Sequence, residues 1–237
     1  MIEHWLALDT ATDIASVAVS IGGQTFTRSV RGARQHAAQI VALIDDVLKA
    51  GSVRLDEVAG LIVADGPGSF TGLRIGWAAA KGLIYGRRQA SLIAIPSLLG
   101  AAHAAGVQTV AACYDALRGQ VYGAIYAFDD AAVKTLVPAG VFTIAELAAA
   151  APRTPVLAVG DGAERYPDDV RHWTGRAPVG LDALPPVAGS LLALYEYEGA
   201  RSPRADASVA EPVYGRPAEA QVKWESRHGR ALPHSSR

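Results

Sequence analysis

The residues most suited to chemistry form a glycine-rich loop that carries two hydroxyl side chains. The loop consists of Gly66, Pro67, Gly68, Ser69 and Thr71. It follows the apolar run 61–64, which predicts a strand, and it precedes a predicted helix over 71–85. A strand, a tight loop and a helix N-terminus in this order can present backbone N–H groups to an anion such as phosphate.

The same order can also form a structural corner, at which the helix packs closely against another segment. No Lys follows a second glycine, so the loop is not a standard nucleotide-phosphate motif. Pro67 also lacks the backbone N–H that a phosphate cradle would use. Both features favour the structural corner over the phosphate site.

The predicted helix 71–85 carries small residues at a spacing of four. Gly72, Gly76 and Ala80 therefore share one face of the helix. Each glycine costs about 1 kcal/mol of helix stability relative to alanine, so the stripe indicates a close backbone approach. The neighbour is either a segment of the same lobe or a second polypeptide, and the spacing leaves both open.

Composition limits the function classes. The chain has 237 residues, enough for one large domain or two lobes, and a net charge of −1. Because the chain has no large excess of positive charge, we expect any RNA to bind through a partner protein. The single cysteine, Cys113, excludes an internal disulfide and favours a reducing compartment. With neither a signal-peptide pattern nor an apolar run of membrane-spanning length, we expect a soluble, cytoplasmic protein without membrane contact.

The order of predicted elements repeats once along the chain. The first half contains strands at 4–9, 14–20, 24–30, 59–64 and 91–95 and helices at 34–50, 71–85 and 97–105. The second half contains strands at 109–115, 121–128, 133–137 and 156–160 and helices at 143–150 and 187–197. In both halves the first strand ends in an acid, Asp9 or Asp115. We therefore predict an internal duplication into lobes 1–105 and 106–237, with the terminal segment free to pack back on the first lobe.

Two β-β-β-α-β-α lobes with an Asp after each first strand resemble the α/β fold of actin, Hsp70 and the sugar kinases (the ASKHA fold), in which two mixed sheets are flanked by helices. Within that group the chain is similar to one family, TsaB, also called YeaZ. The matching segments are 8–12, 35–36, 66–76, 95–98, 115–122 and 214–219. The segment 66–76 is the long and specific one.

This resemblance implies a role in making N6-threonylcarbamoyladenosine at position 37 of tRNA. The family member is a non-catalytic partner subunit of the synthase complex. It pairs with a paralogue, the TsaD transferase, and the ATPase TsaE completes the assembly. The resemblance further implies a homodimer in isolation, tRNA bound through the complex, and no cofactor held by this chain, with ATP or ADP at the shared interface left open.

The partner interface expected from this resemblance lies on the two predicted helices 34–50 and 71–85. Its residues are His36, Ile40, Ile44, Gly72, Gly76, Trp77 and Ala80. The glycines and Ala80 would allow close approach, and the larger side chains would supply apolar contact. His36 is equally compatible with an ordinary surface position.

The loops that bind nucleotide in other proteins of this fold are degenerate here. In the first loop Asp9, Thr10 and Thr12 flank an alanine where a glycine is usual, so Asp9 either binds a metal or caps the turn. In the second loop, after Asp115, Arg118 either touches a phosphate or is a solvated charge.

The metal pair of the paralogue would correspond to Leu99 and His103, and leucine cannot bind a metal. We therefore expect no metal site and no catalytic residue. An ATP-hydrolysing, kinase-like enzyme is the alternative function, and a glycoprotease-type peptidase is disfavoured.

Overall fold

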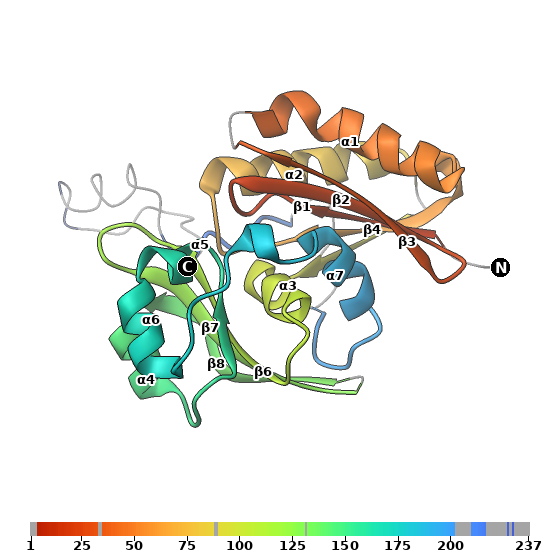
Figure 1. The fold of residues 1–237 in the computed structure, drawn as a ribbon. Helices are drawn as coiled ribbons and strands as arrows, with labels where there is room; N and C mark the ends of the chain where they lie inside the picture. The colour runs from red at the N-terminus through yellow and green to blue at the C-terminus, as the bar shows by residue number, and fades with distance from the viewer. Residues whose placement is uncertain are drawn as a thin grey trace.

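The computed structural model describes residues 4–32, 35–87, 90–130, 132–201 and 210–216, together with positions 227 and 229. It shows two mixed sheets with helices between them and on their outer sides (Figure 1). Much of the predicted loop 199–212, and residues 217–219 of the family resemblance, lie outside the described residues. No helix in the described ranges has the length and apolarity needed to cross a membrane.

The first sheet has the strand order β3-β2-β1-β4-β5. The strands are β1 (His4–Asp9), β2 (Ile14–Ile21), β3 (Gln24–Arg31), β4 (Val58–Ala64) and β5 (Ser91–Ile95). β1 pairs antiparallel with β2 and parallel with β4. The β2–β3 hairpin turns at Gly22 and Gly23, whose φ values of 54° and 83° are those of the left-handed turn that a two-residue hairpin requires.

Two helices lie side by side on one face of this sheet, α1 (His36–Gly51) and α2 (Phe70–Ile84) (Figure 1). The short helix η2 (Leu55–Glu57) precedes β4. The helix predicted over 34–50 extends one residue further, because Gly51 is still helical and Ser52 takes the left-handed conformation at φ 55°. Gly51 packs against the end of the Ile21 side chain, and a Cβ there would lie 2.1 Å from Ile21 Cδ1, so that side chain would have to move.

The second sheet has the order β8-β7-β6-β9, with β6 (Thr109–Asp115), β7 (Val121–Asp129), β8 (Ala132–Phe142) and β9 (Leu157–Val159). This order repeats β3-β2-β1-β4, with the same antiparallel and parallel pairings. The repeated strand order confirms the predicted fold class, a duplicated actin-like fold with two mixed sheets flanked by helices.

Three helices of the second lobe pack beside this sheet: α4 (Ile144–Ala150), α5 (Asp161–Arg165) and α6 (Pro167–Thr174). The predicted helix at 143–150 begins at a capping box formed by Thr143 and Glu146. The sequence pattern does not predict α5 and α6, because helices of five and eight residues are too short to show an apolar stripe.

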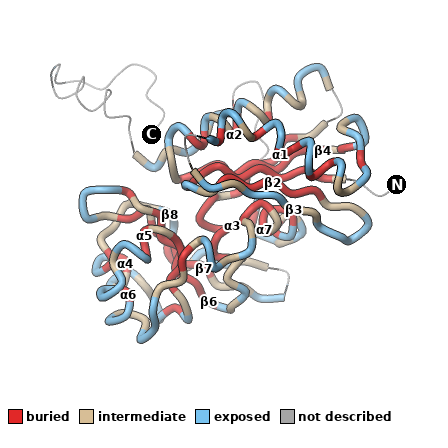
Figure 2. The backbone as a smooth tube through the Cα atoms, turned by 45° about the horizontal axis from the view of Figure 1, so that its top comes forward, coloured by how far each residue is buried: buried red, intermediate tan, exposed pale blue. Residues whose placement is uncertain are grey.

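Two apolar helices lie between the sheets, α3 (Ser97–Ala104) and α7 (Val187–Leu194), and the short helix η3 (Leu181–Ala183) leads into α7. Buried segments gather in this layer and in the central strands (Figure 2). Although α7 comes from the second half of the chain, it packs on the first sheet, where Ala188 N donates to Ser16 Oγ at 3.0 Å. This layer joins both lobes through one continuous core.

Glycines bring the start of α2 against the loop that follows β1. A Cβ on Gly68 would lie 2.3 Å from the carbonyl oxygen of Ala11, and one on Gly72 would lie 2.0 Å from that of Thr10. A Cβ on Gly76 would lie 2.4 Å from Thr10 Oγ1. At Gly68 and Gly72 the close atom is a backbone oxygen, so only glycine permits the approach, and at Gly76 a Cβ would displace the Thr10 hydroxyl. The glycines of the α2 stripe are therefore explained within the first lobe.

Replacement of Gly72 by alanine should destabilise the protein, because the new methyl group meets a backbone oxygen that cannot rotate away. We expect a loss of about 2 kcal/mol or more in the free energy of unfolding, measured by urea denaturation. Gly82→Ala is the matched control, since Gly82 lies on the same helix with nothing within 4 Å of its Cβ position. It should be neutral or stabilising by up to about 1 kcal/mol. Equal stability of Gly72→Ala and wild type would contradict the packing.

Candidate functional site at the Asp9 loop and the paired helices

The backbone donors of the glycine-rich loop are used inside the chain. Gly66 N donates to Ser97 Oγ at 2.8 Å, and Ser69 N donates to the carbonyl oxygen of Ala11 at 2.7 Å. Gly72 N donates to Ser69 Oγ at 3.2 Å, which caps α2. These three N–H groups are not available to an anion, so the geometry supports the structural corner rather than a phosphate site.

The residues predicted to contact a partner are buried in the first lobe. They are His36, Ile40, Ile44, Gly72, Gly76, Trp77 and Ala80. His36 is fully buried, with Nε2 3.1 Å from the carbonyl oxygen of Asp13. This corrects both alternatives considered for His36 and the predicted direct contacts of the other six. The physical reason is that the apolar stripes of α1 and α2 are needed to cover the first sheet and its loop.

The opposite sides of α1 and α2 are exposed, and beside charged residues such as Asp45, Lys49 and Arg74 they carry a set of small or apolar ones. We name this surface the paired-helix face; it consists of Ala38, Val41, Ala42, Phe70, Ala78 and Tyr85. Val41 is 70% exposed, Phe70 39% and Tyr85 89%. They are three of the six large hydrophobic side chains that are exposed in the described part of the chain. Sequence reasoning missed this surface because it assigned the larger apolar stripe to the interface.

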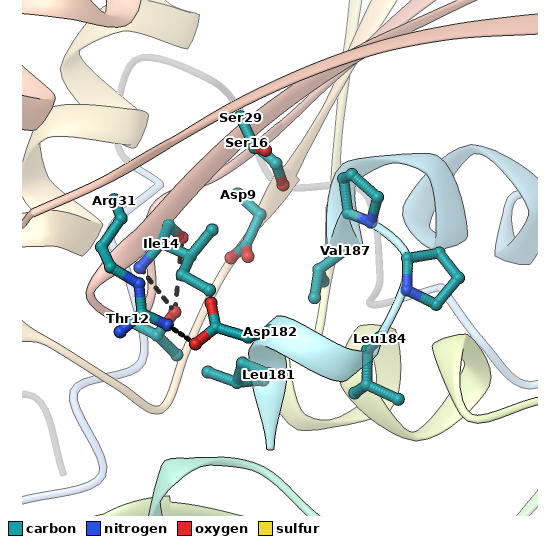
Figure 3. A pocket seen from close by; sticks show the side chains of 12 residues that line it. Asp9, Thr12, Ile14, Ser16, Ser29, Arg31, Leu181, Asp182, Leu184 and Val187 are labelled. Atoms are coloured by element: carbon teal, nitrogen blue, oxygen red, sulfur yellow. Dashed lines mark hydrogen bonds and ion pairs between the residues drawn. The ribbon is translucent and has the colours of Figure 1, made fainter. Parts of the chain in front are cut away.

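The first acidic loop lines a pocket of about 140 Å³ beside η3 and the start of α7 (Figure 3). Asp9 is 1% exposed and points into this pocket, and its Oδ1 accepts the Ala11 N–H at 3.1 Å. Arg31 and Asp182 form an ion pair at the pocket wall. Thr12 also lines the pocket, where its Oγ1 accepts the N–H of Ile14 at 3.2 Å.

Burial raises the pKa of Asp9 from 3.8 to about 7, and the hydrogen bond from Ala11 opposes the shift only in part. Burial therefore favours the neutral form of the carboxyl, and the hydrogen bond from Ala11 is of the kind that caps a turn. Among the residues that the structure describes, no group of three or more His, Cys, Asp or Glu side chains could hold a metal ion. Thr10 stabilises the corner between the β1–β2 loop and α2, since its Oγ1 donates to the carbonyl oxygen of Gly72 at 2.7 Å.

The second acidic loop is held by its own neighbours. Asp115 Oδ1 accepts the N–H of Leu117 at 2.9 Å, and Asp115 Oδ2 lies 3.3 Å from Arg165 Nη1. Arg118 is exposed at the tip of the β6–β7 turn, with a φ of 56°. Asp115 is thus held within its own turn and by Arg165, and Arg118 lies exposed at the tip of that turn.

A second corner matches the first. A Cβ on Gly160 would lie 2.3 Å from the carbonyl oxygen of Cys113, and one on Gly162 would lie 2.6 Å from the carbonyl carbon of Tyr114. Between them, Asp161 Oδ1 accepts the N–H of Asp115 at 3.2 Å, and burial raises the pKa of Asp161. Sequence reasoning overlooked this corner, although two glycines flanking an acid after a predicted strand were a readable signal.

His103 belongs to an aromatic cluster. Its ring packs edge-on against Tyr197 at 5.2 Å and Phe128 at 5.7 Å between centroids, and burial lowers its pKa. Leu99 is 2% exposed in the core. The geometry gives His103 a packing role.

Asp9→Asn should change the pH dependence of stability. Because the folded protein raises the pKa of Asp9 from 3.8 to about 7, the neutral carboxyl is favoured, and stability falls as pH rises between these values. The variant, neutral at every pH, should be more stable than wild type by about 2–4 kcal/mol at pH 8. At pH 4 the two should be similar, as judged by urea denaturation. A variant less stable than wild type at pH 8 would contradict the burial of an unpaired carboxyl.

The chain is similar to known proteins in both sequence and structure. A family model described as TsaD, tRNA N6-adenosine threonylcarbamoyltransferase, matches residues 30–166, more than half of the chain. The solved structure of YeaZ from Pseudomonas aeruginosa superposes with a TM-score of 0.75 and 30% identity, covering 90% of this chain and 100% of that one.

Curated relatives carry the name tRNA threonylcarbamoyladenosine biosynthesis protein TsaB. The Escherichia coli protein is 36% identical over 129 residues, which is 53% of this chain and 55% of that protein. The Bacillus subtilis protein is 28% identical over 199 residues, 81% of this chain and 84% of that protein. The chain spans about half the length of the E. coli and Haemophilus influenzae relatives that it matches. Sequence and structure together show that the chain belongs to the TsaB (YeaZ) family.

Proposed function

We propose that this chain acts in the synthesis of threonylcarbamoyladenosine in tRNA, as the partner subunit that docks on a TsaD transferase through the paired-helix face. The named role of the TsaB relatives supports the pathway. The exposed, apolar character of the paired-helix face is the observation that carries the docking role. Exposed apolar patches on otherwise polar surfaces mark sites of protein association.

The shape of this face suits a helical partner. On α1 the exposed side holds Ala38, Val41 and Ala42 in its first half, while Asp45 and Lys49 occupy the second half. Small side chains allow a facing helix to approach to the usual interaxial distance of about 8–10 Å. The charged half provides a polar rim that water can reach.

The relationship to TsaD supports the same surface. This chain is 30% identical over 100 residues to a tRNA N6-adenosine threonylcarbamoyltransferase from Geobacter metallireducens. We infer that the transferase carries a corresponding pair of helices, so the two proteins would join by like surfaces about a pseudo-two-fold axis. Two copies of this chain could pair in the same way when the transferase is absent.

The chemistry would then belong to the transferase. Asp9 is a buried acid without a cationic partner among the described residues, and Asp115 is tied to Arg165. We assign neither of them a step in catalysis. TsaE, the tRNA and any ATP or ADP would be bound by the assembled complex.

Single glutamates on the paired-helix face should prevent assembly. Ala42→Glu on α1 and Ala78→Glu on α2 replace exposed residues, so folding should be retained, yet each would bury a charge in the interface. We expect at least about hundredfold weaker binding to TsaD of the same organism, measured by calorimetry, and a matching loss of tRNA modification.

The control is Ala149→Glu, the same substitution at an exposed position of α4 in the second lobe. It should bind TsaD as wild type does. Wild-type binding by both α1 and α2 variants would contradict the proposed docking surface.

A further inference from the structure

We propose that Arg74 is a recognition point for a carboxylate side chain of the protein partner, at the edge of the paired-helix face. The proposal rests on the proposed function, because it names the chemistry of the partner that docks there. It concerns a residue on α2 that lies one turn after Phe70 and one turn before Ala78 on the exposed side.

Two aromatic rings hold the Arg74 side chain in place. Its guanidinium carbon lies 4.0 Å from the centroid of the Phe70 ring and 5.6 Å from that of Tyr214. The two rings contact each other with centroids 4.7 Å apart. Arg74 Nε donates a hydrogen bond to Tyr214 Oη at 3.1 Å. The guanidinium is therefore fixed at its Nε edge and over one face.

No described residue bonds to the outer edge of the same guanidinium. Arg74 is exposed, and neither Nη1 nor Nη2 bonds to any residue in the described part of the chain. Four N–H donors in a planar fork are thus directed away from the bracket formed by the two rings. An arginine on the surface usually loses much rotamer freedom on binding. Here the bracket has already restricted that freedom.

Tyr214 is itself anchored by the C-terminal segment 210–216, which crosses from one lobe to the other. Val213 N donates to the carbonyl oxygen of Asp65 in the first lobe at 2.6 Å. Arg216 Nη1 donates to the carbonyl oxygen of Ala116 in the second lobe at 2.7 Å. Tyr214 is therefore a positioning residue, placed by both lobes against the start of α2.

The surroundings favour a protein carboxylate as the occupant. The two outer N–H groups of an arginine fork match the two oxygens of a carboxylate. Phe70, which is 39% exposed and lies against the guanidinium, offers apolar surface that would exclude water from one side of such a pair. Binding of a nucleic-acid backbone relies on many cations, and the chain as a whole has a net charge of −1. Because Phe70 also belongs to the paired-helix face, the Arg74 bracket continues that surface.

Substitutions of Arg74 and Tyr214 in the full chain test the proposal. Arg74→Lys keeps the charge and loses the fork, and we expect about tenfold weaker binding to TsaD. Arg74→Ala should weaken binding at least as much and reduce its dependence on salt between 50 mM and 500 mM NaCl. Tyr214→Phe keeps the ring and removes the Nε contact, so a smaller loss of about threefold is expected. Arg171→Lys, on the exposed side of α6, is the control and should change nothing.

The outcomes separate this inference from the proposed function. Wild-type affinity of both Arg74 variants, together with failed binding by Ala42→Glu, would overturn the carboxylate site and leave the docking surface intact. Normal binding of TsaD by the Arg74 variants with a loss of tRNA affinity in the complex would also overturn it, because the anion would then be an RNA phosphate. If Ala42→Glu and Ala78→Glu bind normally as well, the proposed function itself fails.

Discussion

The close approach of α2 to the loop after β1 is the constraint on which the rest of the first lobe depends. A Cβ at Gly72 would lie only 2.0 Å from the carbonyl oxygen of Thr10, so the helix and the loop are in direct backbone contact. This contact fixes the rotation of α2 about its axis. The glycine side must face the loop, and consequently Phe70, Arg74 and Ala78 must face outward.

The same arrangement explains why a loop suited to phosphate chemistry is a structural element here. The backbone N–H groups of Gly66 and Ser69 donate to Ser97 Oγ and to the carbonyl oxygen of Ala11. These hydrogen bonds hold the loop against α3 and the β1–β2 turn. The second lobe repeats the device at Gly160. Both lobes therefore contain the same kind of backbone corner, while Asp9 is buried without a cationic partner among the described residues.

Much of the fold could be predicted from the sequence, because strands and long helices have periodic patterns that survive without tertiary information. The repeat of β1–β4 in β6–β9 and the ends of most elements agree with those predictions. The short helices α5 and α6 could not be predicted, since stretches of this length carry no measurable period. The direction of the small-residue stripe could not be predicted either. Gly76 on a helix face indicates a close neighbour and does not say which one.

The candidate site was predictable only in outline. The sequence singles out the helices 34–50 and 71–85 as the candidate partner interface. The side of each helix that faces solvent, however, depends on the sheet beneath them. Ile40 and Ile44 are buried against that sheet, whereas Val41, between them in the helix, is 70% exposed. The bracket around Arg74 depends on Tyr214, which is 140 residues further along the chain and is brought there by the segment that joins the lobes.

Hydrogen–deuterium exchange of this chain, with and without TsaD of the same organism, tests the central claim most directly. Docking through the paired-helix face predicts slower exchange on binding in peptides from α1 and α2, and in the segment 210–216 that holds Tyr214. Peptides from α4 and α6 should exchange at the same rate in both states. Protection confined to the second lobe, or no protection anywhere, would contradict the account.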